Sequence, residues 1–431
     1  MTKILRSKSF FKWLFKYRLF FLLFSVFVLF FVSRIYGMDV KYPFGWDQVD
    51  NAWAAKNIIV NHEFPLVGMV AKGNTGFFIG PLYYYFVTLF YWTTGLNPVA
   101  SQYIALTTSI FTFFAIFFVV KKIFNFKIAL IACLVNSVAS SGFYFDSVQW
   151  PVGFLPGISL LIFYFLYKLL KGKEKYVLYL AIMMGLAFHI HFTAVFFPII
   201  ALLCLPFFPR TKKMFLYLLL SVPLFLVWFV PNLISQIQNS SQLSNMSNYL
   251  NTYYHGFHLR RFMQLTGDGL IQFDPFLFFV QIKPLKILIL PIFILVFFRE
   301  KISRDRMVFV YLTLIFFLVP WLVFSVYRGE ISDYYFSINR YIVLFILSYL
   351  LSKLLFAKML LIKVLAIILL VFYSYQNLNL VINYKSENGL KAKIERIEQE
   401  IKIDHRVEFQ HGASESYIYY YLMKQRGISV Y

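Results

Sequence analysis

The chain has 431 residues, of which 60% are hydrophobic, 21% aromatic and only 14% charged, and its mean hydropathy is +0.69. Soluble globular domains carry about a quarter charged residues, so this composition excludes that class and indicates an integral membrane protein. The net charge of +22 does not indicate nucleic-acid binding, because the basic residues form short clusters between apolar runs, as cytoplasmic loops of membrane proteins do.

The apolar runs predict an all-α polytopic membrane protein with about 11 transmembrane helices, because each run has the length of a spanning helix and exceeds that of a barrel strand. The basic N-terminus predicts a cytoplasmic start, so the first helix, at about 19–36, leads outward. No small-residue cleavage site follows this helix, which is therefore expected to be retained. Further spans are expected at about 100–120, 128–144, 154–170, 176–190, 192–208, 214–230, 284–298, 307–326, 338–352 and 359–375.

The first interruption, residues 37–99, is predicted to form a large extracytoplasmic loop. Its last part, 81–95, is apolar and aromatic but short for a span. If it crossed the membrane, the next lysine clusters would lie outside, against the positive-inside rule. We therefore expect a juxtamembrane helix on the outer face.

We expect a transmembrane part at 1–376 and a small extracytoplasmic α/β segment at 377–431. In the second part, isoleucines recur at helical spacing among charges over 391–402, which predicts an amphipathic helix. Short strands are expected at 406–410 and 428–431. Because about 55 residues bury too little surface to fold alone, the segment should dock on the outer loops.

Two acids in the first outer loop are candidates for chemistry. Asp47 and Asp50 lie three residues apart between Trp46 and Trp53, and on a helix this spacing places both carboxylates on one face. A carboxylate within hydrogen-bond reach of a substrate hydroxyl, in a pocket partly closed to water, can act as a general base. Solvated loop acids without a role are the alternative interpretation.

Several motifs together resemble one known family. They are Asp47-Gln48, the run 62–68, Gly80-Pro81-Leu82-Tyr83-Tyr84-Tyr85, Trp150-Pro151, the stretch 185–198 and Asn339-Arg340-Tyr341. In this order they resemble the glycosyltransferase C superfamily, and within it bacterial proteins similar to dolichyl-phosphate-mannose protein mannosyltransferases and the aminoarabinose lipid A transferase. The likeness is good over about 10–210 and looser beyond. Many members have two adjacent acids where this chain has Asp47 followed by Gln48.

The resemblance implies that Asp47 is the catalytic residue of a membrane glycosyltransferase. Nucleotide sugars stay in the cytoplasm, so transfer on the outer face needs a sugar carried by a polyprenyl phosphate. Asp47 would take the proton of an acceptor hydroxyl while that oxygen inverts the anomeric carbon, and a cation should face the departing phosphate. The candidate substrate-binding residues are Asp50, Lys72, Tyr83, His191, Arg260, Arg261 and Arg340.

The expected partners are a polyprenyl-phosphate sugar, a cell-envelope glycan, lipid or protein as acceptor, and membrane lipids, with no nucleic acid. The expected location is the bacterial plasma membrane, with a cytoplasmic N-terminus and an extracytoplasmic C-terminal segment. No cofactor is predicted, because the histidines lack the spacing of a zinc site; a divalent metal stays open.

Two other functions stay open. A polymerase or ligase of surface polysaccharide also has many helices and outer-loop arginines, but it would depend on a large late outer loop and assign Asp47 no role. A transporter of lipids or sugars tends to place ionisable groups within its spans and to show internal repeats. Almost every acid of this chain lies in a loop, which disfavours the transporter.

Overall fold

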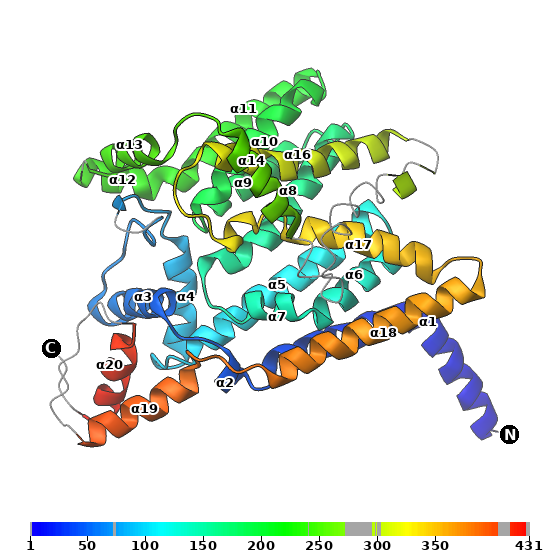
Figure 1. Ribbon diagram of the computed structural model, residues 1–431, viewed down its shortest axis with the longest axis horizontal. Helices are drawn as coiled ribbons and strands as arrows, with labels where there is room; N and C mark the ends of the chain where they lie inside the picture. The colour runs from blue at the N-terminus through cyan, green and yellow to red at the C-terminus, as the bar shows by residue number, and fades with distance from the viewer. Residues whose placement is uncertain are drawn as a thin grey trace.

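The computed structural model describes residues 2–71, 75–239, 241–271, 295–297, 299, 303–403 and 414–427. Over these residues the protein is helical and has no β-strand beyond isolated bridges (Figure 1). Its α-helices are α1 (Thr2–Ile35), α2 (Met38–Lys41), α3 (Trp46–Lys56), α4 (Leu82–Thr93), α5 (Ala100–Ile123), α6 (Phe126–Val138), α7 (Ser140–Asp146), α8 (Leu155–Leu170), α9 (Tyr176–Phe188), α10 (Phe196–Cys204), α11 (Lys212–Leu226), α12 (Val230–Gln238), α13 (Ser241–Tyr253), α14 (Leu259–Ile271), α16 (Arg304–Val326), α17 (Arg340–Leu355), α18 (Leu360–Asn383), α19 (Leu390–Ile403) and α20 (Ser416–Gln425).

Several helices are suited to a membrane, as the composition indicated. In the described ranges, five helical stretches are long and apolar enough to cross one, and the bent pair α6–α7 is a sixth candidate. Shorter apolar helices cover 19–35, 176–188 and 192–207. The predicted span at 284–298 falls almost entirely outside the described residues, so the count of 11 stays a prediction.

Burial separates core helices from helices that face the surroundings. Within 212–238, an 18-residue segment has a mean hydropathy of 2.2, yet only 11% of that segment is buried. Large apolar side chains left uncovered in such numbers belong against lipid. The 18-residue segment chosen in the same way within 151–170, the stretch that contains α8, is 78% buried. Helix α8 is therefore a central helix.

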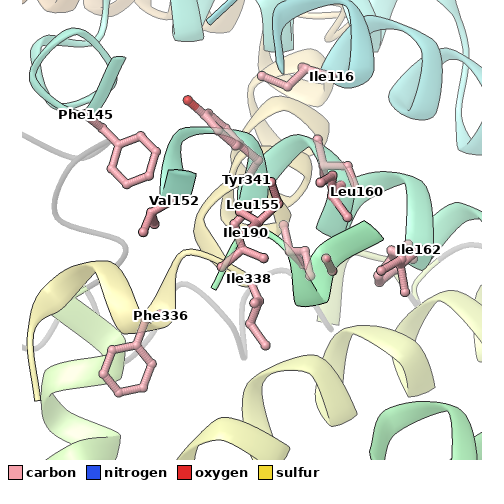
Figure 2. Close-up of a cluster of buried hydrophobic side chains, with 14 of the residues drawn as sticks. Ile116, Phe145, Val152, Leu155, Leu160, Ile162, Ile190, Phe336, Ile338 and Tyr341 are labelled. Carbon is pink, nitrogen blue, oxygen red and sulfur yellow. The ribbon is translucent and has the colours of Figure 1, made fainter. Parts of the chain in front are cut away.

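Helix α8 lies at the centre of the core of the described residues. Helix α8 packs on α5, α9, α16 and α17. Figure 2 shows Leu155 and Leu160 of α8 among apolar side chains from other segments, including Val152, Ile190 and Ile338. Within a membrane such packing is stabilised mainly by van der Waals contact, because lipid is as apolar as the side chains themselves.

The span predicted at 128–144 is not one straight helix, which corrects that expectation. Helices α6 and α7 meet at an angle of 71°, and Ala139 between them has an extended backbone. The break is held by Asn377 of α18, whose Oδ1 accepts hydrogen bonds from the backbone N–H (3.0 Å) and hydroxyl (2.8 Å) of Ser140. The amide thus satisfies a helix N-terminus that would otherwise be unpaired.

A buried ion pair fixes the end of α7. The guanidinium of Arg34, at the end of α1, donates from Nη2 to Asp146 at 2.8 Å and from Nη1 to the carbonyl of Ser137 at 2.8 Å. Arg34 is fully buried and Asp146 nearly so. The pair ties α1 to both halves of the bent helix, and so sets the course of the chain that continues to Trp150.

The C-terminal segment docks on the loop formed by residues 37–99, and the sequence predicted this docking. Trp53 of α3 donates from Nε1 to the hydroxyl of Ser416 at 2.9 Å, and the hydroxyl of Tyr417 donates to the carbonyl of Leu96 at 2.9 Å (Figure 1). The amphipathic helix expected at 391–402 is α19. Helix α18 continues past 376 to Asn383.

The predicted strands at 406–410 and 428–431 lie outside the described residues. The α/β character of the C-terminal segment and the division at 376 therefore stay predictions.

Candidate active site

Helix α3 carries both loop acids, and Gln48 fixes how it begins. The side-chain Oε1 of Gln48 accepts a hydrogen bond from the backbone N–H of Gly45 at 2.7 Å, which caps the helix. Its Nε2 donates to the carbonyl of Gln149. An ionised acid at position 48 could not donate this second bond. The glutamine beside Asp47 is therefore a structural residue that holds α3 against the 147–154 segment.

Asp47 lies at the wall of a small cavity of about 90 Å³. Three further polar or aromatic side chains, Trp150, His191 and Tyr334, line it from distant parts of the chain. The rest of the wall comes from residues 69–71, Ile79, 151–152 and Ile190. Four segments that are far apart in sequence therefore converge on one carboxylate.

A turn in the first outer loop forms one side of this cavity. The backbone N–H of Gly68 donates to Ile79 (2.8 Å), that of Ile79 to Met69 (3.1 Å), and that of Ala71 to Phe77 (2.7 Å). Lys72 lies outside the described residues, but it directly follows Ala71, which lines the cavity.

The carboxyl group of Asp47 has a raised pKa. Burial raises the pKa of its carboxyl group to about 6, and the nearby charge of Asp50 contributes in the same direction. Within the described ranges no hydrogen-bond donor is paired with this carboxylate, although its backbone carbonyl accepts from Asn51. The carboxylate is therefore available to accept a proton from a molecule in the cavity.

Asp50 faces a different space from Asp47. The two residues are about 60° apart around the helix, since each residue advances about 100°. Asp50 is exposed, its Oδ2 accepts a hydrogen bond of 2.6 Å from Tyr84, and it lines an outer groove rather than the cavity. The helix thus presents one carboxylate to the cavity and one to the groove.

His191 and His189, two residues apart, have different surroundings. Nδ1 of His191 accepts from the backbone N–H of Thr193 at 3.3 Å, so the neutral ring carries its proton on Nε2. The ring lies against Tyr334 and Tyr335, with centroids 5.7 and 5.6 Å apart. His191 is therefore a wall residue with a donor nitrogen.

His189 instead supports the Gly80-Pro81-Leu82 motif. Its Nδ1 accepts from the backbone N–H of Leu82 at 3.2 Å, and its Nε2 lies 2.9 Å from the carbonyl of Trp228. A Cβ atom at Gly80 would lie 2.1 Å from Nδ1 of this ring. Position 80 therefore accepts only glycine without movement of the histidine.

Tyr83 is buried on the inner side of α4. Its hydroxyl accepts a hydrogen bond from Nε2 of Gln149 at 2.9 Å, and its ring packs edge-on against Phe154 with centroids 6.4 Å apart. Together with the bond between Gln48 and Gln149, this contact links α3 and α4 through a single residue. Tyr83 lies beside the cavity wall without lining the cavity itself.

The three candidate arginines lie apart from the cavity lining. Arg340, at the start of α17, donates from Nη2 to the carbonyl of Ser141 at 2.6 Å and lies 4.5 Å from the centroid of the Phe145 ring. Phe145 contacts Trp150, with centroids 5.2 Å apart, so one aromatic layer separates Arg340 from the cavity.

The other two arginines are on α14. Arg261 donates from Nη2 to the carbonyl of Gly329 at 2.8 Å and from Nε to that of Phe324 at 3.3 Å. These bonds attach α14 to the end of α16. Arg260 is exposed.

Among the described residues, the side chains around Asp47 do not fit a metal site held by the protein. Asp47 and Asp50 line different spaces, both ends of the Gln48 amide are bonded, and Nδ1 of His191 accepts from Thr193. Among the residues that the structure describes, no group of three or more His, Cys, Asp or Glu side chains is placed to hold an ion. We therefore derive no step through a metal.

Two cavity residues, Trp150 and Tyr334, were not predicted as site residues. For Trp150 the sequence did offer a signal, because the Trp150-Pro151 pair matches part of a motif of the resembling family. Tyr334 lies in a short loop before α17 and had no sequence signal; its ring contacts Trp150 and His191 with centroids 5.1 and 5.7 Å apart. Only the tertiary structure brings it to Asp47.

Comparisons with known proteins agree with this architecture. The family model described as dolichyl-phosphate-mannose-protein mannosyltransferase matches residues 79–234. No curated protein matches the chain by sequence. The structure is similar to ArnT from Cupriavidus metallidurans bound to undecaprenyl phosphate, with 13% identity, coverage of 92% of this chain and 84% of ArnT, and a TM-score of 0.60.

The apo state of the same ArnT matches with 12% identity, coverage of 92% and 83%, and a TM-score of 0.59. The Archaeoglobus fulgidus oligosaccharyltransferase, in complex with zinc and sulfate, matches with 15% identity and a TM-score of 0.52 over 88% of this chain and 55% of its own. These matches confirm the resemblance drawn from the motifs. The chain is a multi-pass membrane protein with the fold of the glycosyltransferase C superfamily.

Proposed function

We propose that this protein transfers a sugar from a polyprenyl-phosphate donor to an acceptor hydroxyl on the outer face of the bacterial plasma membrane, with Asp47 as general base. The observation that carries the proposal is the cavity itself. A carboxylate with a raised pKa lies at its wall together with His191, Trp150 and Tyr334. A carboxylate partly shielded from water in this way can take a proton from a bound hydroxyl.

The reaction follows from these groups. The acceptor hydroxyl gives its proton to Asp47 while its oxygen forms a bond to the anomeric carbon. The bond from that carbon to the phosphate oxygen breaks, the electron pair leaves with the polyprenyl phosphate, and the sugar configuration inverts. The ring Nε2–H of His191 is a donor suited to a sugar hydroxyl, which orients the donor sugar beside the carboxylate.

The departing phosphate needs a cation. Arg340 is held by Ser141 and Phe145, and Arg261 by two backbone carbonyls, so we assign these two arginines to supporting roles. Lys72 lies outside the described residues and, with Arg260, stays a candidate for the phosphate.

An apolar groove beside the cavity suits the lipid chain of the donor. Its volume is about 380 Å³, and its lining is almost entirely aromatic and aliphatic. Phe192, the residue after His191, is part of that lining, so the groove begins where the cavity wall ends. The ArnT structure, which has undecaprenyl phosphate bound, supports a polyprenyl carrier.

The test is an in vitro transfer assay with a panel of polyprenyl-phosphate sugars on wild type, Asp47→Asn and Asp39→Asn. Asp39 is an exposed acid that lies 3.3 Å from Lys391, so its variant controls for loss of one negative charge. We expect transfer by wild type and Asp39→Asn, and a loss of at least about 100-fold in Asp47→Asn with folding unchanged. Equal rates in the two variants would refute the assignment and favour a polymerase or ligase that does not use Asp47.

Orientation is tested separately. We propose that the N-terminus is cytoplasmic and that the first outer loop and the C-terminal segment are extracytoplasmic. Single cysteines introduced at Glu63 and at Lys385 should react with a membrane-impermeant maleimide in intact cells. Labelling of either position only after the cells are opened would contradict this topology.

A further inference from the structure

A groove along α3 carries side chains that do not line the Asp47 cavity. Its volume is about 530 Å³, and it is open to solvent on one side. It is lined along one face of α3 and the helical turn that follows by Trp46, Asp50, Trp53, Lys56, Asn57 and Asn61. These positions recur every three or four residues, so they form one continuous stripe.

The two tryptophans of this stripe are exposed or only half-buried, unlike the aromatic residues of the core. Trp46 is 67% exposed, whereas Trp53 is half-buried and its Nε1 is bonded to Ser416. Trp53 also packs against Tyr417 and Tyr420 of α20, with centroids 5.5 and 5.1 Å apart. The C-terminal helix therefore holds the second tryptophan in place, while the first presents an open face.

The polar residues of the stripe complete a set suited to hydroxyl groups. The carboxylate of Asp50 lies between the two tryptophans and is oriented by the hydroxyl of Tyr84 at 2.6 Å. The amides of Asn57 and Asn61 follow on the next turns, where Nδ2 of Asn61 donates to Oδ1 of Asn57 at 3.4 Å. Carboxylates and amides can each bond to two neighbouring hydroxyls, and aromatic faces pack against the C–H face of a sugar ring.

From this arrangement we infer that the groove binds a saccharide chain, which is the acceptor or the part of the acceptor next to the reacting sugar. The inference rests on the proposed function, because the chain would enter from Trp46, the residue next to Asp47. It narrows the acceptor from glycan, lipid or protein to a glycan. The groove supplies binding, and the cavity supplies chemistry.

A membrane contact would be the other use of an exposed tryptophan. The neighbours of Trp46 disfavour it, because Asp50, Lys56, Asn57 and Asn61 would have to enter the interface with it. Lipid-facing helices of this protein look different: the exposed positions of α11 include Phe215, Leu219 and Val222.

The test measures binding without a donor. Purified protein in nanodiscs is examined by saturation-transfer NMR with chitotetraose, mannotetraose and maltotetraose, for wild type, Trp46→Ala, Asp50→Asn and Trp92→Ala. Trp92 is a matched control, because it is 69% exposed and lies on α4 outside the groove. We expect at least one tetrasaccharide to bind, with affinity reduced about tenfold in Trp46→Ala and unchanged in Trp92→Ala.

The outcomes separate the two proposals. Asp47→Asn is measured in the same way. Saccharide binding that requires Trp46 and persists in Asp47→Asn supports the groove, even if no sugar is ever transferred. Transfer to a lipid or peptide acceptor with no tetrasaccharide binding overturns the groove and leaves the reaction intact. Quenching of Trp46 by brominated phospholipids, with equal saccharide signals in wild type and Trp46→Ala, shows a membrane contact and also overturns it.

Discussion

Burial, together with the nearby charge of Asp50, should set the pH at which Asp47 becomes active. Burial and the Asp50 carboxylate together raise the pKa of Asp47 from 3.8 to about 6. With that value about a tenth of the Asp47 groups are ionised at pH 5, half at pH 6 and about nine-tenths at pH 7. Because only the ionised form accepts a proton, kcat/KM should rise about tenfold from pH 5 to pH 7 and then level off.

The informative perturbation is Asp50→Asn. The amide keeps an oxygen for the hydrogen bond from Tyr84 but removes the like charge, so the pKa of Asp47 should fall and the acidic limb should move to lower pH. Burial still acts on Asp47, so its pKa should stay above 3.8. The readout is the pH at which kcat/KM reaches half of its plateau. A loss of acceptor binding would lower kcat/KM at every pH without changing that midpoint.

The assay is transfer measured from pH 4.5 to 8 at low acceptor concentration, for wild type, Asp50→Asn and Asp39→Asn. Asp39 does not contribute to the pKa shift of Asp47, so its variant should keep the wild-type limb. A wild-type rate that is flat between pH 5 and 7 would refute Asp47 as the titrating base. If the midpoint pH of kcat/KM is unchanged or higher in Asp50→Asn than in wild type, the electrostatic coupling is refuted.

Three further predictions concern the support of the site. Gly80→Ala should lower the free energy of unfolding by about 2–4 kcal/mol, from a clash with His189 and the strain on its hydrogen bonds; thermal unfolding in detergent measures this, and the added substitution His189→Ala should recover part of it. Asp146→Asn should lower the free energy of unfolding by about 3–5 kcal/mol, because it leaves Arg34 buried without its counter-charge. A melting temperature equal to that of wild type would contradict this. Tyr417→Ala should release the C-terminal segment from the first outer loop, which limited proteolysis detects as faster cleavage after residue 383; an unchanged digestion pattern would count against the docking.

Much of this architecture could be predicted from the sequence because the signals are local. The composition and the lengths of the apolar runs indicated a membrane protein. The spacing of Asp47 and Asp50 would place both carboxylates on one face if their segment were helical; the segment is helix α3, but the two carboxylates line different spaces. The isoleucine spacing in the tail predicted α19. Each of these depends on neighbours within a few turns, where helical periodicity and length are decisive.

The sequence by itself determined that this is a helical membrane protein and that Asp47 and Asp50 lie in the polar segment after its first apolar helix. Only the tertiary structure decided that Asp47 faces a cavity and Asp50 a groove, that Gln48 is a cap, and that Tyr334 reaches the carboxylate from nearly 300 residues away in the chain. The physical reason is that a cavity is formed by side chains from segments with no local relation to each other, so its lining depends on how bent helices such as α6–α7 redirect the chain.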